Sequence, residues 1–217
     1  MAHEEHEDLD ERLLHRMLFF TDAVFAIVLT ILVLELKPPE SFREANVHTL
    51  RHMIPHIGAF IFSFTIISVF WIAHMNTTRK LMRFDWPTAL ANLLFLLPIC
   101  LLPFATSWVG ADINGGFAWA IYSWTLVAIS SANMVTVLVA YRGSGRLVQG
   151  GASRREVAYR LARSAAPGTA FAVGLLVLAA GQTILAHMCW VLIGPCFWLA
   201  EAVLKPKAAP PAAEPAA

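Results

Sequence analysis

Long apolar stretches, separated by short polar joints, run along the chain from residue 17 to residue 204. A helix needs about 20 mostly apolar residues to cross a membrane, and six stretches meet this requirement. They predict transmembrane helices over residues 17–36, 54–74, 87–109, 117–141, 165–181 and 183–204. We therefore expect an all-α membrane protein with six transmembrane helices. Only Gly181 and Gln182 separate the last two, which predicts a tight hairpin or a broken helix.

The composition and the charge pattern agree with this reading. Hydrophobic residues make up 58% of the chain and charged residues only 14%, whereas a soluble domain carries about 25% charge. Lys and Arg collect in cytoplasmic loops. With six spans and a cytoplasmic N-terminus, only three of the 16 Lys and Arg residues, Lys37, Arg43 and Arg51, fall outside. We therefore expect both termini in the cytoplasm.

The two ends of the chain differ from the apolar middle. Residues 1–15 are acidic, and we expect them to form a flexible N-terminus. They lack the basic start and the cleavage site of a signal peptide, so the first apolar run is expected to remain as a helix. Residues 205–217 are rich in Pro and Ala, which predicts a disordered tail. The six-helix transmembrane domain is then expected over residues 16–204.

The first span carries charged residues in an apolar setting. Asp22 lies one or two turns into the helix, where a carboxylate is costly unless it has a partner or faces water. Arg16 is six residues away, about 240° around the helix axis, so the two cannot pair on one face. We interpret Arg16 and Asp22 as polar groups directed toward neighbouring helices. Their expected partners are His74, Asn92 and Trp71, which would form an interhelical hydrogen-bond network.

A second feature of the first span is a stripe of branched side chains. Ile31, Leu34 and Thr30 lie within about 60° of Ile27 around the helix axis, whereas Asp22 lies about 140° away. Periodicity alone favours ordinary helix packing for this stripe. It leaves open whether the stripe has any further role.

Several sequence elements resemble a known family. The first span begins with Arg16-x-x-x-Phe20-Thr21-Asp22, followed by AVFAIVLTILVLEL. This is similar to the Arg-x-x-x-Phe-Ser-Asp pattern of the transmembrane-protein-175 potassium channels, which are lysosomal in animals and widespread in bacteria; here Thr21 replaces serine. Further matches, in order along the chain, are Trp71-x-x-His74 and LANLLFLLPICLLPFAT over residues 90–106. The resemblance is strong over about the first half of the chain.

The resemblance implies a potassium-permeant cation channel in a bacterial cell membrane. Bacterial members of the family are tetramers whose first helices line a central pore, without the P-loop selectivity filter of ordinary potassium channels. Carried over, Ile27 is the innermost constriction of the pore, and Ile31 and Leu34 are further layers. Thr30 corresponds to a hydroxyl-bearing position involved in potassium selectivity. The implied partners are other copies of the chain, as a homotetramer, and membrane lipid.

Other functions have less support from the sequence. No nucleophile–base arrangement, carboxylate pair or HExxH motif is visible, so we do not expect an enzyme, a resident metal or a cofactor, and potassium would be only the permeant ion. No nucleic-acid partner is expected. The main alternative is a proton-coupled secondary transporter that uses Asp22, His74 and Asp85 as a relay. A membrane scaffold without conduction is a third reading.

Overall fold

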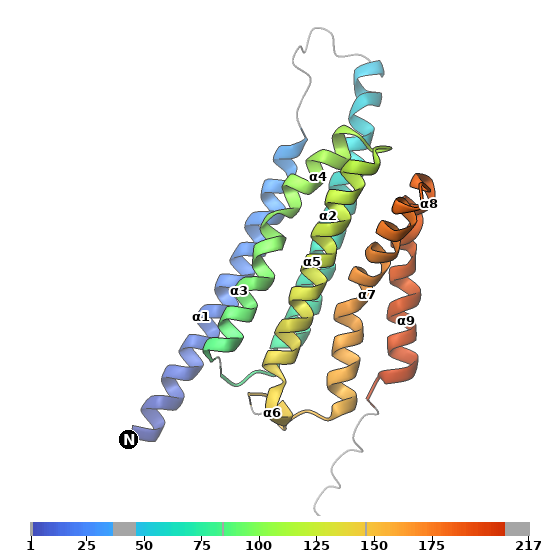
Figure 1. Ribbon diagram of the computed structural model, residues 1–217. Helices are drawn as coiled ribbons and strands as arrows, with labels where there is room; N and C mark the ends of the chain where they lie inside the picture. The colour runs from blue at the N-terminus through green and yellow to red at the C-terminus, as the bar shows by residue number, and fades with distance from the viewer. Residues whose placement is uncertain (1, 37–46, 84, 146, 207–217) are drawn as a thin grey trace, which may run out of the picture.

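The computed structural model describes residues 2–36, 47–83, 85–145 and 147–206 (Figure 1). Helices long and apolar enough to cross a membrane account for most of these residues, and no named strand occurs among them. The six candidate spans are Glu11–Glu35, Met53–Thr78, Trp86–Ala111, Gly116–Ala140, Arg154–Ala179 and Thr183–Leu204. The expected all-α architecture with six transmembrane helices is thus confirmed. The first helix begins and the last helix ends at the same end of the bundle (Figure 1), as an even number of spans requires.

The first helix is longer than the sequence predicted. Helix α1 spans Ala2–Ile31 and is followed by the 3-10 helix η1, Leu32–Glu35. It therefore includes residues 2–15, for which we expected a flexible segment. The beginning of α1 extends beyond the neighbouring helices (Figure 1).

The second and third spans differ in how straight they are. Helix α2 is continuous over Val47–Thr78 even though it contains Pro55. The third span breaks into α3, Trp86–Cys100, and α4, Leu102–Ala111. Two prolines, Pro98 and Pro103, flank the break. Proline has no backbone N–H, so each one removes a hydrogen bond from the helix and favours a kink.

The fifth span begins earlier than predicted. Helix α5, Gly116–Ala140, is followed by the single turn α6, Arg142–Gly145, and then by α7, Arg154–Ala179. The sequence reading began this helix at residue 165 and treated the preceding basic segment as a loop. The cause is an N-terminal cap, since Ser153 Oγ accepts a hydrogen bond from the Glu156 backbone N–H at 3.1 Å. The Ser-x-x-Glu spacing is a known helix-start signal.

The last two spans form the hairpin that was one of the two predicted outcomes. Gly181 makes the turn with a φ of 80°, a conformation that glycine adopts without steric cost. The final span consists of α8, Thr183–Met188, the 3-10 helix η3, Cys189–Leu192, and α9, Ile193–Leu204. Helix α9 packs back on α7, and Arg163 pairs with Glu201 across 3.6 Å. The predicted tail beyond Pro206 lies outside the described residues.

The centre of the bundle is packed with aromatic and branched side chains, while large apolar side chains also cover its outside. Among the described residues, the largest fully buried side chains are those of Phe25, Phe70, Phe95, Tyr122 and Phe171. Exposed apolar side chains are expected on helices that contact lipid. Helices α5 and α7 approach closely at Gly168, where a Cβ atom would lie only 2.5 Å from the Ser130 Cβ. Small residues at such contacts let membrane helices pack tightly.

Candidate ion pathway and its supporting contacts

Helix α1 has one buried face and one exposed face. The buried face packs into the subunit through Leu14, Thr21, Phe25 and Val28, and Leu32 at the start of η1 continues it. The stripe singled out in the sequence lies on the other side: Ile27 is 55% exposed, Ile31 42% and Leu34 70%. Packing within one subunit therefore does not account for the stripe.

Thr30 belongs to the exposed face as well. Its hydroxyl donates a hydrogen bond to the Ile27 carbonyl oxygen at 2.8 Å. The hydroxyl proton is thereby directed into the helix, and a hydroxyl oxygen retains lone pairs that can accept or coordinate. Thr30 thus presents an oxygen beside apolar neighbours.

Two polar side chains of α1 hold the helix to the rest of the subunit. The Trp71 indole Nε1, on α2, donates to Asp22 Oδ1 at 2.9 Å. The Asn92 amide Nδ2, on α3, donates to Thr21 Oγ1 at 2.8 Å, and both of these residues are buried. The structure thus places Asp22, Trp71 and Asn92, three of the residues expected in an interhelical network, in contacts between helices, and the fourth partner is Thr21 of the first-helix pattern.

His74 joins this group by stacking rather than by hydrogen bonding. Its ring lies against Phe95 with centroids 4.9 Å apart and close to parallel planes, and Phe25 lies 6.4 Å away. Neither ring nitrogen has a hydrogen-bond partner among the described residues. His74 therefore fills the space between α1 and α3 and does not continue the Asp22 hydrogen bond.

Arg16 and Phe20 lie on a different side of α1 from the one expected for Arg16. The sequence reading grouped Arg16 with Asp22, but the eleven residues from Arg16 to Ile27 turn a helix through about 1100°, which leaves Arg16 within about 20° of Ile27. In the structure Arg16 and Phe20 line a cavity at the end of the bundle, and Phe20 is 48% exposed. Arg16 therefore lies on the side of the stripe and not beside Asp22.

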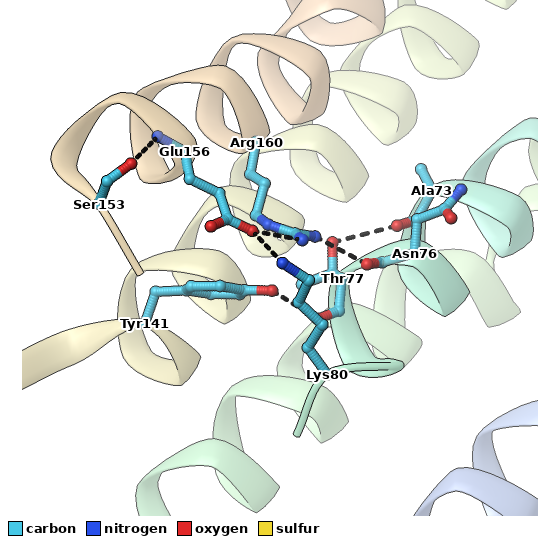
Figure 2. Close-up of polar contacts among 8 residues, drawn as sticks. All are labelled: Ala73, Asn76, Thr77, Lys80, Tyr141, Ser153, Glu156 and Arg160. Atoms are coloured by element: carbon cyan, nitrogen blue, oxygen red, sulfur yellow. Dashed lines mark hydrogen bonds and ion pairs between the residues drawn. The ribbon is translucent and has the colours of Figure 1, made fainter. Parts of the chain in front are cut away.

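The end of α2 is held by side chains from other helices (Figure 2). Arg160 of α7 donates to the Asn76 carbonyl oxygen at 2.7 Å, and the Tyr141 hydroxyl donates to the Thr77 carbonyl oxygen at 3.0 Å. The last carbonyl groups of a helix have no partner within it. These two contacts supply partners and join the end of α2 to α5 and α7.

Charged groups surround the same contacts. Glu156 Oε1 accepts from Lys80 Nζ and from Arg160 Nη2, each at 2.9 Å (Figure 2). The Arg160 guanidinium lies over the Tyr141 ring, 4.8 Å from its centroid. Burial raises the pKa of the Tyr141 phenol to about 12, although Arg160 lowers it. The phenol therefore stays protonated and can donate to the α2 carbonyl.

Sequence reasoning missed this contact group, which we call the α2 clamp: Tyr141, Glu156, Arg160 and the end of α2. The Ser153-x-x-Glu156 cap and the four-residue spacing from Glu156 to Arg160 were its visible signals. Neither spacing predicts that the side chains reach α2, because that contact joins residues more than 60 positions apart.

The structure does not connect the three residues of the alternative proton relay. Asp85 accepts from the Thr88 backbone N–H at 3.1 Å and pairs with Arg142, whereas Asp22 bonds to Trp71. Among the described residues, no hydrogen bond joins any two of Asp22, His74 and Asp85. A relay through these groups would need a rearrangement of the bundle.

Comparison with known proteins finds similarity to one family, mainly over the first half of the chain. Residues 16–103 match the family described as endosomal/lysosomal potassium channel TMEM175. A potassium channel of Chryseobacterium sp. (strain P1-3) is 36% identical over 97 residues, which cover 45% of this chain and 49% of that protein. The endosomal/lysosomal proton channel TMEM175 of Rattus norvegicus is 27% identical over 132 residues, 58% of this chain and 26% of that protein. The match to the bacterial relative thus spans about half of its length.

A solved structure extends the similarity over most of the fold. The crystal structure of a lysosomal potassium-selective channel TMEM175 homologue from Chamaesiphon minutus superimposes with a TM-score of 0.64 and 26% identity. The superposition covers 87% of this chain and 95% of that one. The second half of the chain, where the sequence resemblance is weak, therefore shares the fold as well.

Proposed function

We propose that this chain belongs to the TMEM175 family and forms a potassium-permeant cation channel whose pore is lined by α1. The observation that carries the proposal is the exposed stripe of Ile27, Ile31 and Leu34 on a helix whose opposite face is anchored in the subunit. One helix cannot enclose a pore, so several copies must contribute. A closed symmetric ring is the usual solution, and we propose a homotetramer in a bacterial cell membrane with both termini in the cytoplasm.

The stripe has the chemistry of a hydrophobic gate. Ile27 and Ile31 are one turn apart, which separates their rings by about 6 Å along the helix axis. Narrow apolar rings exclude water and block hydrated ions until the helices move or rotate. A ring of Thr30 oxygens between these layers would replace part of the water around a potassium ion and so favour its passage.

The choice of permeant ion rests on the relatives. The Chryseobacterium protein is named a potassium channel, whereas the rat protein is named a proton channel. We propose potassium because the stripe carries no titratable side chain and offers an oxygen at Thr30. A proton-coupled carrier is the alternative, and coupling of the fluxes distinguishes the two.

Recording from purified protein in planar bilayers tests the function. With potassium and sodium on opposite sides, we expect a current that follows the electrical gradient and reverses at a potential set by potassium. Transport that requires a proton gradient would favour the carrier, and the absence of any flux would favour a scaffold.

The gate is tested by a polar substitution with a matched control. Ile27→Asn should raise the conductance, because an amide ring holds water where isoleucine excludes it. Ile184→Asn places the same side chain on an exposed position of α8 that is not on the stripe, and it should leave the conductance unchanged. An unaltered current in Ile27→Asn would remove Ile27 from the gate.

A further inference from the structure

A large cavity opens beside the N-terminal half of α1. It has a volume of about 980 Å³, which is at the upper end of the range for ligand pockets. Its walls come from α1, from the start of α3 and from the segment that follows α5. These parts lie at the end of the bundle where the chain begins (Figure 1). By the distribution of Lys and Arg, this is the cytoplasmic end.

The polar part of the cavity is cationic. Arg16, Arg83 and Arg142 line it, against a single carboxylate, Asp85. Asp85 pairs with Arg142 and also accepts from the Thr88 backbone N–H and from the Thr88 hydroxyl at 2.6 Å. Arg142 makes two further hydrogen bonds, which leaves two of its five N–H donors for another ligand. The lining residues therefore carry a net positive charge. Guanidinium groups bind phosphate through paired hydrogen bonds, so a phosphate group is the matching ligand.

The other part of the cavity is apolar. Leu13, Phe20 and Trp86 line it and are 51%, 48% and 88% exposed. A small anion such as free phosphate would leave this apolar surface exposed to water, whereas a hydrocarbon chain would cover it. Trp86 is the first residue of α3, a position where tryptophan side chains lie at the level of the lipid headgroups.

We propose that this cavity binds an anionic phospholipid of the cytoplasmic leaflet. Its phosphate lies between Arg16 and Arg142, and its acyl chain follows Phe20 and Trp86. Basic residues near the cytoplasmic surface of a membrane attract the anionic lipids of that leaflet. The ligand joins the N-terminal half of α1 to α3.

Lipid binding would also act on conduction, an extension that rests on the proposed function. The cavity extends around α1 from Arg16 to Met17, which lies about 80° from Ile27 toward the buried face. The bound lipid therefore lies beside the stripe and touches the same helix that lines the pore. Occupancy of the cavity then changes the position of α1 and with it the current.

Native mass spectrometry of the purified assembly tests the binding. We use phosphatidylglycerol and phosphatidylcholine with the same acyl chains, and inorganic phosphate as a third probe. Phosphatidylglycerol should be retained in preference to the other two. Arg16→Gln should weaken its retention about fivefold, the usual effect of one basic residue at a membrane surface. Arg154 is an exposed arginine at the same end of the bundle but outside the cavity, and Arg154→Gln should leave the retention unchanged.

A second variant tests the apolar wall without changing the charge. Trp86→Gln should weaken the retention of phosphatidylglycerol and leave that of inorganic phosphate unchanged. Equal retention of the two lipids, or retention that neither variant alters, would overturn the proposal, as would phosphate that displaces the lipid completely.

A flux measurement in liposomes separates this site from the channel function. Added phosphatidylglycerol should change potassium flux through the wild type and not through Arg16→Gln, whereas selective binding without any flux would refute only the channel.

Discussion

The Trp71 indole donates a hydrogen bond to Asp22 Oδ1 at 2.9 Å, and this bond joins α1 to α2. Asp22 lies about 140° around the helix from Ile27. The helix is therefore anchored on one side while its stripe of branched residues points away from the subunit. The orientation of the proposed gate thus depends on a polar contact almost on the opposite side of the same helix.

Loss of the indole donor should destabilise the subunit. Trp71→Phe removes the hydrogen bond to Asp22, and we expect the free energy of unfolding to fall by about 1–2 kcal/mol, the range for a bond to a charged partner between membrane helices. Thermal unfolding of the protein in detergent measures the change. Asp22→Asn keeps an oxygen acceptor for the indole and should lower the melting temperature less. A Trp71→Phe protein as stable as the wild type would contradict this role.

The hydroxyl at position 21 should matter more than the methyl group. Thr21→Val removes the acceptor of the buried Asn92 amide, and we expect a loss of about 1 kcal/mol because an interhelical hydrogen bond is lost within the membrane. Thr21→Ser restores the serine of the family pattern, keeps the hydroxyl and should remain close to wild type. Yields of folded oligomer compare the two variants, and equal yields would show that the hydroxyl is dispensable.

Selectivity should depend on the Thr30 hydroxyl. Thr30→Val has nearly the same shape but offers no oxygen to a permeating ion, so the preference for potassium over sodium should fall. The shift of the reversal potential under opposed potassium and sodium gradients measures this preference. Thr30→Ser supplies the matched control with the hydroxyl retained. If Thr30→Val keeps the wild-type reversal potential, selectivity arises elsewhere.

The α2 clamp should stabilise the end of the bundle at which α2 ends. Tyr141→Phe removes the donor to the Thr77 carbonyl oxygen and should cost about 1 kcal/mol. Arg160→Gln should cost more, about 2 kcal/mol, because it removes both the donor to Asn76 and a cation beside Glu156. Chemical unfolding followed by tryptophan fluorescence measures both losses. Arg154→Gln removes an arginine one turn and a half earlier on the same helix, and a similar loss there would indicate a general charge effect.

The apolar pattern was enough to predict six spans, because membrane helices must satisfy their own backbone and therefore appear as long apolar runs. It also predicted that Asp22 and Trp71 belong to one network, since a carboxylate in a membrane needs a partner. The predicted start of α7 was wrong because the residues of Arg154–Arg163 are too polar to count as part of a span, although they are helical and Ser153 caps the helix. Local signals of this kind compete with hydropathy at the ends of spans.

The parts that the sequence could not predict are contacts between distant segments. Nothing in the spacing of Tyr141 and Arg160 shows that they meet carbonyl groups of α2. The cavity beside Arg16 likewise depends on where α3 and the end of α5 lie relative to α1. Arg16 itself was assigned to the wrong side of its helix, although helical geometry alone could have placed it near Ile27.

The close approach of α5 and α7 couples the substitutions that positions 130 and 168 can accept. A Cβ atom at position 168 would lie 2.5 Å from the Cβ of Ser130, so alanine can enter at 168 without moving the helices apart only if position 130 becomes glycine in the same lineage. Related chains are therefore expected to change these two positions jointly. Correlated substitutions at positions 130 and 168 would indicate the contact between α5 and α7, even in sequences too divergent for the first-helix pattern to be recognised.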